Sequence, residues 1–346
     1  MKYGLIEGFY GPPWPWGARR GLAPFLADHG YGFYIYAPKN DRSLRQQWRS
    51  DWPATELREL EATAEAYRGA GMAWGVGLSP HEAWREPVSA VGPALEAKAG
   101  RLMDLGLDLL AVLFDDMRGD TDRLAERQAE IVWRLSEGAR PAHLLVCPTY
   151  YSDDPLLDQL FGRRPDGYLE ELGRLLASDV DMFWTGPSVL SADYCPAHMR
   201  DVAGRMGRQP FLWDNYPVND VGRIDHLHLG AFGQTSPELT ELIAGHAVNP
   251  MLQAELSRIP LATLADRYRL GHGYDPETSF RAALTAECDQ ELATRLAIDA
   301  PLFQEQGRRG LTSEQLERLS AGYSALPGAM AAEVVAWLAV TGTGHL

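Results

Sequence analysis

The sequence has few cysteines, no long apolar run and no excess of positive charge. Its three cysteines, Cys147, Cys195 and Cys288, are widely spaced and match neither a zinc-ligand set nor a disulfide framework. No apolar stretch is long enough to cross a membrane, and the N-terminal MKYGLIEGFYG lacks an apolar region of signal-peptide length. These absences predict a cytoplasmic protein, in a reducing compartment and without a membrane partner.

The charge balance excludes another class of partner. The formal net charge is −15, whereas nucleic acids and anionic membranes are bound through clustered Lys and Arg. Neither is therefore expected as a partner. With 346 residues, 45% of them hydrophobic, the chain can build a large core without metal or disulfides. It has room for an α/β barrel of roughly 250 residues and a smaller appendage.

Short apolar segments alternate with amphipathic helical patterns along most of the chain. The expected strands are Tyr3–Glu7, Gly32–Tyr36, Ala73–Leu78, Leu109–Phe114, Leu144–Cys147, Met182–Trp184, Pro210–Trp213 and Leu227–Gly230. This alternation indicates a parallel sheet with crossover helices, and eight repeats predict closure into a (β/α)8 TIM barrel. After about Asn249 only helical patterns follow. We expect a catalytic barrel over residues 1–270 and a small α-helical C-terminal region over residues 271–346.

Polar and aromatic residues follow nearly every expected strand. The segments are EGFYGPPW, YAPKND, FDDM, CPTYY, WTGPSV and WDNYPVND. The carboxyl ends of barrel strands converge on one mouth, so these side chains should meet there. Tyr and Trp rings pack on the apolar face of a pyranose, while Asp, Asn and Lys bind its hydroxyls. The pattern predicts a sugar-binding site.

The adjacent carboxylates Asp115 and Asp116 are the candidate catalytic pair. Neighbouring side chains in a strand point to opposite faces, so the extended conformation must end near Asp115 for both to reach the mouth. Two close carboxylates should raise the pKa of one of them, which places an acid beside a base. Helix N-capping is the alternative interpretation of such a pair. The flanking strand ends favour catalysis.

The adjacency of the two aspartates restricts the chemistry. The carboxylates of ordinary retaining and inverting glycosidases lie roughly 5–9 Å apart, and adjacent residues do not easily straddle a scissile bond in that way. Adjacency suits substrate-assisted catalysis, in which the 2-acetamido oxygen of the sugar attacks the anomeric carbon. One carboxylate then polarises the acetamido N–H and the other protonates the leaving oxygen. The substrate must therefore carry an N-acetyl group.

Seven motifs in a fixed order resemble one known family. EGFYGPPW, YAPKND, LFDDM, CPTYY, WTGPSV, WDNYPVND and VNP span about Glu7 to Asn249. Together they resemble glycoside hydrolase family 84, which contains the O-GlcNAcases and related β-N-acetylglucosaminidases. The resemblance implies a (β/α)8 barrel, net retention of the β configuration and an oxazoline intermediate. It implies neither a metal nor an organic cofactor.

The resemblance also implies roles for individual residues. Asp115 would polarise the acetamido group, and Asp116 would be the general acid and then the general base. The sugar-binding residues would be Gly8 through its backbone, Lys39 at the ring, Tyr151 at the acetamido oxygen, Asn215 at the acetamido carbonyl, Asp220 at the 4- and 6-hydroxyls, Asn249 at the 3- or 4-hydroxyl, and Cys147, Thr185, Val189 and Trp213 around the N-acetyl methyl group.

Other features have simpler interpretations or depart from the family. Tyr150 stands where the family often has Glu, and Asn40 where it often has Asp, which affects the aglycone side. Residues 230–234, after the last expected strand, lack a basic residue that would be expected nearby. His226 and His228 have no nearby third metal ligand and are expected to be structural. The arginine-rich stretch over residues 42–49 is expected to be solvated.

These observations predict a retaining exo-β-N-acetylglucosaminidase of the O-GlcNAcase type. Its substrate would be a GlcNAc-bearing glycoprotein, glycopeptide or oligosaccharide, and its helical tail could pair two copies into a homodimer. Two alternatives remain: an endo-acting, hyaluronidase-like hexosaminidase and a non-catalytic GlcNAc-binding protein. The negative charge argues against a polyanionic chain as substrate. The presence of both Asp115 and Asp116 argues against a binding protein.

Overall fold

The computed structural model describes residues 2–139, 141–234, 236 and 238–340. The chain forms two compact units whose segments alternate along the sequence. The barrel unit comprises Met1–Gly8, Tyr31–Asn215 and Thr235–Val248, and the helical unit comprises Phe9–Gly30, Tyr216–Gln234 and Asn249–Leu346. The domain boundary expected near residue 270 stays a prediction.

The barrel unit contains eight parallel strands. They are β1 (Lys2–Glu7), β2 (Phe33–Tyr36), β3 (Ala73–Leu78), β4 (Leu109–Leu113), β5 (His143–Cys147), β6 (Asp181–Trp184), β7 (Phe211–Asp214) and β8 (Gly245–Val248). Each strand pairs with the next, and β8 pairs with β1, so the sheet is a closed barrel. The expected (β/α)8 barrel is confirmed, and the first seven expected strands coincide with β1–β7 to within a residue or two.

The eighth expected strand is wrong. Leu227–Gly230 lies in the helical unit, where the Leu227 N–H donates to the Phe303 carbonyl (3.2 Å) and the Gly230 N–H to Gln304 Oε1 (2.9 Å). The true strand is β8, whose four residues GHAV give a weaker apolar signal. A basic residue was expected near residues 230–234 because that segment was taken to follow the last strand. The segment does not follow it, since the last strand is β8 and the barrel unit ends at Val248.

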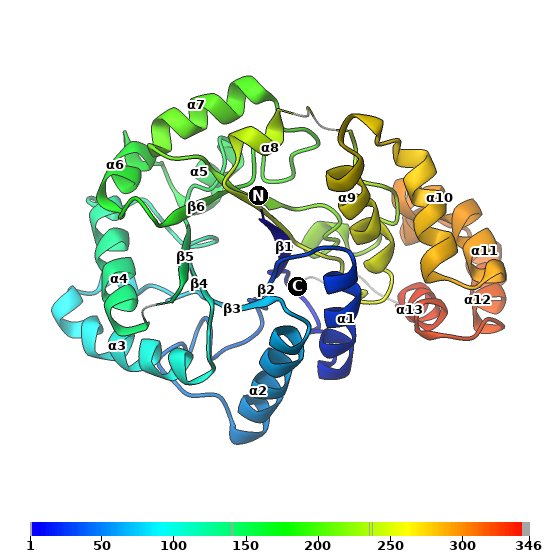
Figure 1. The fold of residues 1–346 in the computed structure, drawn as a ribbon, viewed down its shortest axis with the longest axis horizontal. Coiled ribbons are helices and arrows are strands. Elements are labelled where there is room, and N and C mark those ends of the chain that lie inside the picture. The colour runs from blue at the N-terminus through cyan, green and yellow to red at the C-terminus, as the bar shows by residue number, and fades with distance from the viewer. Residues whose placement is uncertain (1, 140, 235, 237, 341–346) are drawn as a thin grey trace. The chain divides into compact units, whose positions relative to one another are not determined.

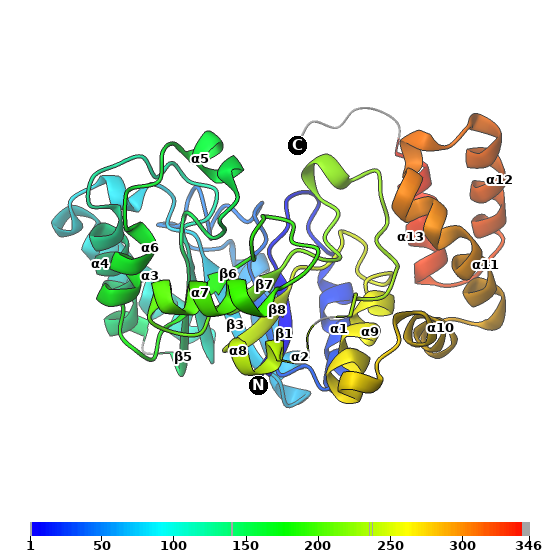
Figure 2. The same cartoon turned by 90° about the horizontal axis from the view of Figure 1, so that it is seen from above.

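Seven helices lie in the described part of the barrel unit. They are α2 (Ala54–Gly69), α3 (Val88–Asp104), α4 (Leu124–Ala139), α5 (Pro155–Phe161), α6 (Tyr168–Leu175), α7 (Pro196–Met206) and α8 (Leu239–Leu242), with the short turn η1 (Ala83–Arg85). Figure 1 shows α2, α3, α4, α6 and α7 outside the strands. Figure 2 shows α5, which follows β5, at the opposite end of the barrel from α8, which leads into β8. The end with α5 is therefore the mouth formed by the carboxyl ends of the strands.

The helical unit contains the remaining helices. They are α1 (Trp16–Asp28), α9 (Arg258–Leu270), α10 (Pro276–Glu287), α11 (Gln290–Pro301), α12 (Ser313–Ser324) and α13 (Ala329–Leu338), with short turns η2 (Val221–Arg223), η3 (Gly271–Gly273), η4 (Leu302–Gln306) and η5 (Arg308–Gly310). α10 and α11 are separate helices because Asp289 caps α11, where its side chain accepts from the backbone of Leu292 (2.9 Å).

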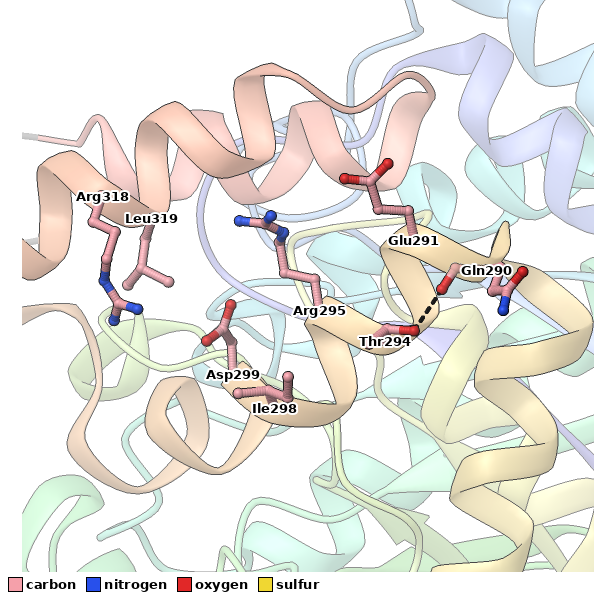
Figure 3. A pocket seen from close by; sticks show the side chains of 8 residues that line it. All are labelled: Gln290, Glu291, Thr294, Arg295, Ile298, Asp299, Arg318 and Leu319. Carbon is pink, nitrogen blue, oxygen red and sulfur yellow. Dashed lines mark hydrogen bonds between the residues drawn. The ribbon is translucent and has the colours of Figure 1, made fainter.

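A cavity of about 480 Å³ lies between α11 and α12, lined by side chains that include Arg295, Asp299 and Arg318 (Figure 3). None of the expected site residues lines it.

Among the described residues, no helix combines the length and apolar character that crossing a membrane requires.

Aromatic rings fill the barrel interior, and glycine makes room for them. The Phe33 and Phe211 rings meet edge to face, with centroids 5.8 Å apart. Gly245 lies opposite Phe211 in the β7–β8 register, and a Cβ on it would lie 2.3 Å from that ring. Real Cβ atoms do not approach so closely, so glycine at this position is a packing requirement.

We expect Gly245→Ala to lower the free energy of unfolding by about 1–3 kcal/mol, the usual cost of overpacking a filled core. Gly204→Ala on α7 is the matched control, because a Cβ added at Gly204 would have no atom of the described residues within 4 Å, apart from its chain neighbours and the backbone of its own helix. That change should be neutral or slightly stabilising, since alanine favours helix. Urea unfolding of both variants measures the difference, and equal stabilities would contradict the packing described for Phe211.

Candidate active site

The conformation at the end of β4 brings two adjacent aspartates to the barrel mouth. β4 ends at Leu113, and the Phe114 N–H still bonds to the Cys147 carbonyl of β5 (2.9 Å). Asp116 then adopts a left-handed conformation with φ of 57°. Asp tolerates this region better than most residues. The expected end of the extended conformation is confirmed, and helix N-capping is excluded because α4 begins only at Leu124.

Asp115 is the more buried aspartate, with 5% of its surface exposed. The buried Lys39, which follows β2, donates from Nζ to Asp115 Oδ2 and also lies 5.5 Å from the centroid of the Trp213 ring. Asp115 Oδ1 is buried and has no hydrogen-bond partner among the described residues. A buried acceptor without a donor costs about 1–3 kcal/mol. The arrangement therefore offers a carboxyl group with one oxygen paired to Lys39 and the other able to accept from a ligand N–H.

Asp116 is half-buried and has different partners. The Tyr151 hydroxyl donates to Asp116 Oδ1 (3.0 Å), and Arg45 Nη2 donates to the Asp116 carbonyl (3.2 Å). Burial, with the nearby charges of Asp116 and Asp115, raises the pKa of Tyr151 well above its ordinary value. The phenol consequently stays protonated and continues to donate. Its expected contact with an acetamido oxygen stays a prediction.

Arg45 is a site residue that the sequence analysis missed. The stretch over residues 42–49 was expected to be solvated, and Arg42 and Arg49 are indeed exposed. Arg45, however, is only 6% exposed and holds the backbone of Asp116. Nothing in the local sequence distinguishes it from its neighbours, because the contact depends on how the loop folds over the barrel mouth.

Hydrogen bonds connect the expected N-acetyl pocket residues across the ends of β5, β6 and β7. Trp213 Nε1 donates to Asn215 Oδ1 (2.9 Å), and Asn215 Nδ2 donates to the Val189 carbonyl (2.9 Å). The Thr185 N–H donates to the Tyr151 carbonyl (3.0 Å). The structure thus brings these residues together beside the aspartates.

Cys147, at the end of β5, is fully buried. Burial, and secondarily the charge of Asp115, raises the pKa of the Cys147 thiol well above its ordinary value. A protonated thiol is a poor nucleophile, so Cys147 is expected to be a small buried apolar side chain and not a reactive group.

The other three expected residues are divided between the two units. Gly8 is buried directly after β1 in the barrel unit. Asp220 and Asn249 belong to the helical unit, where Asp220 Oδ2 accepts from the Tyr10 N–H (2.7 Å) and Asn249 is buried. Their roles toward a sugar stay predictions.

Asn219 links the two segments that carry Asp220 and Asn249. It is fully buried, and its Nδ2 donates to Gln253 Oε1 (2.9 Å) while its Oδ1 accepts from the Leu252 N–H (2.9 Å). The motif WDNYPVND contains Asn219, but the sequence analysis assigned it no role.

The remaining residues singled out in the sequence differ in burial and in their contacts. Tyr150 is fully buried and donates to the Gly162 carbonyl (2.7 Å), whereas Asn40 is exposed. Burial, with the charges of Arg223 and His226, lowers the pKa of His228 to about 3. Among the described residues, no group of three or more His, Cys, Asp and Glu could hold a metal ion.

The chain resembles several known proteins. Rat and mouse proteins named Protein O-GlcNAcase are each 28% identical to it over 280 residues, which is 77% of this chain but only 30% of each relative. The match therefore spans less than a third of these curated relatives. A solved structure of a mutant O-GlcNAc hydrolase from Thermobaculum terrenum is similar at a TM-score of 0.80 and 28% identity, covering 97% of this chain and 80% of that chain.

The sequence model of one family covers most of the chain. The family is described as NAGidase, beta-N-acetylglucosaminidase, and its model matches residues 3–298. With the ordered motifs and the barrel, this match shows that the chain belongs to the beta-N-acetylglucosaminidase family, glycoside hydrolase family 84.

Proposed function

We propose that the chain is a retaining exo-β-N-acetylglucosaminidase of the O-GlcNAcase type that uses the 2-acetamido group of its substrate as the nucleophile. The observation that carries the proposal is the different environment of the two adjacent aspartates. Asp115 is buried beside a lysine and keeps one oxygen without a partner among the described residues, whereas Asp116 is half-buried beside a tyrosine. Different environments assign different tasks to two carboxylates.

In the first proposed step, Asp115 Oδ1 accepts the acetamido N–H, while Lys39 Nζ donates to Asp115 Oδ2 and holds the carboxylate in place. The polarised acetamido oxygen attacks the anomeric carbon, and the bond to the leaving oxygen breaks. Asp116 gives its proton to that oxygen. The product of this step is a protonated oxazoline (an oxazolinium ion), whose N–H stays hydrogen-bonded to the Asp115 carboxylate, and the aglycone leaves as an alcohol.

In the second proposed step, the Asp116 carboxylate removes a proton from water. The resulting hydroxide attacks the anomeric carbon and opens the oxazoline, which restores the acetamido group. Two inversions give net retention. The Tyr151 hydroxyl, which donates to Asp116 Oδ1, orients the Asp116 carboxyl group through both steps.

The proposed sugar contacts follow the residues at the strand ends. Trp213, Thr185, Val189 and Cys147 would enclose the acetyl methyl group, with Asn215 at the acetamido carbonyl. Gly8, Asp220 and Asn249 would bind the sugar hydroxyls.

We propose GlcNAc on a protein, peptide or oligosaccharide as the substrate class. The names of the relatives, Protein O-GlcNAcase and O-GlcNAc hydrolase, support the protein-linked sugar. A homodimer is a further proposal. A cytoplasmic location is also proposed and is supported by three free cysteines, of which Cys195 is exposed.

The dependence on the acetamido group is the direct test of this function. The purified protein should cleave 4-nitrophenyl N-acetyl-β-glucosaminide with a kcat/KM about 10⁴-fold above that for the plain β-glucoside, which lacks both the nucleophile and the N–H. Release of 4-nitrophenol measures both reactions. Equal rates would refute substrate assistance, and tight GlcNAc binding without any release would favour the non-catalytic alternative.

A further inference from the structure

Lysine is rare in this chain and is buried wherever its side chain is described. Only three of the 32 basic residues are lysines, namely Lys2, Lys39 and Lys98. Lys39 is 3% exposed and Lys98 is fully buried. A lysine ends in a compact ammonium group with three donors, whereas arginine ends in a broad planar fork. The rare use of lysine at two buried positions suggests that each needs such a point charge.

Lys98 lies on α3 and binds the loop between β2 and α2, residues 37–53. Its Nζ donates to the Ser43 carbonyl (2.7 Å) and to the Ser50 carbonyl (3.1 Å). The same Nζ lies 3.9 Å from the centroid of the Trp52 ring, in cation–π contact. One ammonium group therefore holds three points of this loop.

Inside the loop, Asp41 joins the two ends. Its Oδ1 accepts from the Ser43 N–H (2.9 Å), and its Oδ2 accepts from Trp52 Nε1 (2.8 Å) and from the Tyr36 hydroxyl (2.9 Å). The segments that Lys98 binds are thus also connected to each other. Loss of the Lys98 contacts would therefore displace the whole loop and not a single residue.

The same loop supplies both cations that hold the aspartates. Lys39 pairs with the Asp115 carboxylate, and Arg45 bonds to the Asp116 carbonyl. We propose that Lys98 is a positioning residue that fixes this loop on α3 and thereby sets the placement of Asp115 and Asp116. The proposal rests on the proposed glycosidase function for its catalytic consequence, but not for the attachment of the loop.

The cost of burying Lys98 supports a specific role. Burial, together with the nearby Arg101 and against the attraction of Asp41 and Asp51, lowers the pKa of Lys98 to about 8. The lowered pKa means that the fold disfavours the charged form, and an apolar side chain of similar length would avoid that cost. The contacts of Lys98 to the loop compensate for the cost of burying its charge.

Lys98→Met tests the proposal, because methionine fills the same space without the donors. Lys98→Arg keeps the charge, and Arg134→Met is the control. Arg134 lies on α4 and pairs with Glu96 of α3, so its loss removes a cation next to α3 without a described contact to the loop. Each variant is measured by amide hydrogen exchange over residues 37–53 and by kcat and KM on 4-nitrophenyl N-acetyl-β-glucosaminide.

Lys98→Met should accelerate exchange in this loop and lower kcat by about 10²-fold, with a smaller change in KM, because misplaced catalytic groups affect the transition state most. Lys98→Arg should recover only part of the lost kcat, because it restores the charge but not the compact ammonium group, and Arg134→Met should resemble the wild type. Unchanged exchange in Lys98→Met would overturn the attachment, and faster exchange with an unchanged kcat would overturn the positioning role. An inactive wild type would instead refute the proposed function, while the exchange data would still decide the attachment.

Discussion

Asp116→Asn is expected to lower kcat/KM about 10²–10⁴-fold on a β-N-acetylglucosaminide with a poor leaving group, the range that a positioned general acid contributes. A substrate with a dinitrophenyl leaving group should lose far less. Such a group departs as a stable anion and needs no proton. An alkoxide or simple phenoxide needs one, and asparagine has none to give.

The measurement compares the wild type and Asp116→Asn on a series of aryl glycosides of decreasing acidity. The wild type should depend weakly on the leaving group and the variant strongly. Asp122→Asn is the matched control, because Asp122 is an exposed carboxylate in the same loop after β4. If Asp116→Asn lost the same factor on every substrate, Asp116 would not be the acid.

Asp115→Asn is expected to lower kcat/KM by about 10²–10³-fold, the cost of removing a preorganised electrostatic contact from a transition state. The loss should be similar for good and poor leaving groups, because polarisation of the acetamido N–H assists the attack and not the departure. This pattern differs from that of Asp116→Asn, so the two variants together separate the two roles.

Asp115→Asn also affects Lys39, so the stability of this variant must be measured separately. The substitution removes the carboxylate that pairs with the buried ammonium group of Lys39, and breaking a buried ion pair costs about 3–5 kcal/mol of stability. Urea unfolding should show this loss, and the kinetics must be recorded where the variant is still folded. A leaving-group dependence like that of Asp116→Asn would contradict the separate assignment.

The barrel could be predicted because buried parallel strands are recognisable in the sequence as short apolar runs. β3 and β4 are short apolar runs between helical patterns, and burial on both faces requires such runs. The same rule produced the error at Leu227–Gly230. Both Leu227 and Leu229 are fully buried, but in the helical unit. An apolar run in the sequence predicts that its residues are buried, but it does not predict in which unit of the fold they are buried.

The candidate site was predictable in its residues but not in its contacts. Lys39 and Asp115 lie 76 positions apart, Tyr151 and Asp116 lie 35 apart, and Arg45 and Asp116 lie 71 apart. Strand ends identified the segments YAPKND and CPTYY as facing one mouth, and the family resemblance then singled out Lys39 and Tyr151 within them. Arg45 and Lys98 belong to a loop and to a helix face, where no period marks a functional side chain.

The sequence by itself determined that two carboxylates are adjacent after a buried strand, and from this adjacency it predicts a substrate sugar with a 2-acetamido group. Only the tertiary structure decided that the two aspartates differ. Barrel closure buries Asp115 beside Lys39 and leaves Asp116 half-buried beside Tyr151. The physical reason is that burial and pairing depend on which distant segments meet, whereas adjacency is a property of the chain.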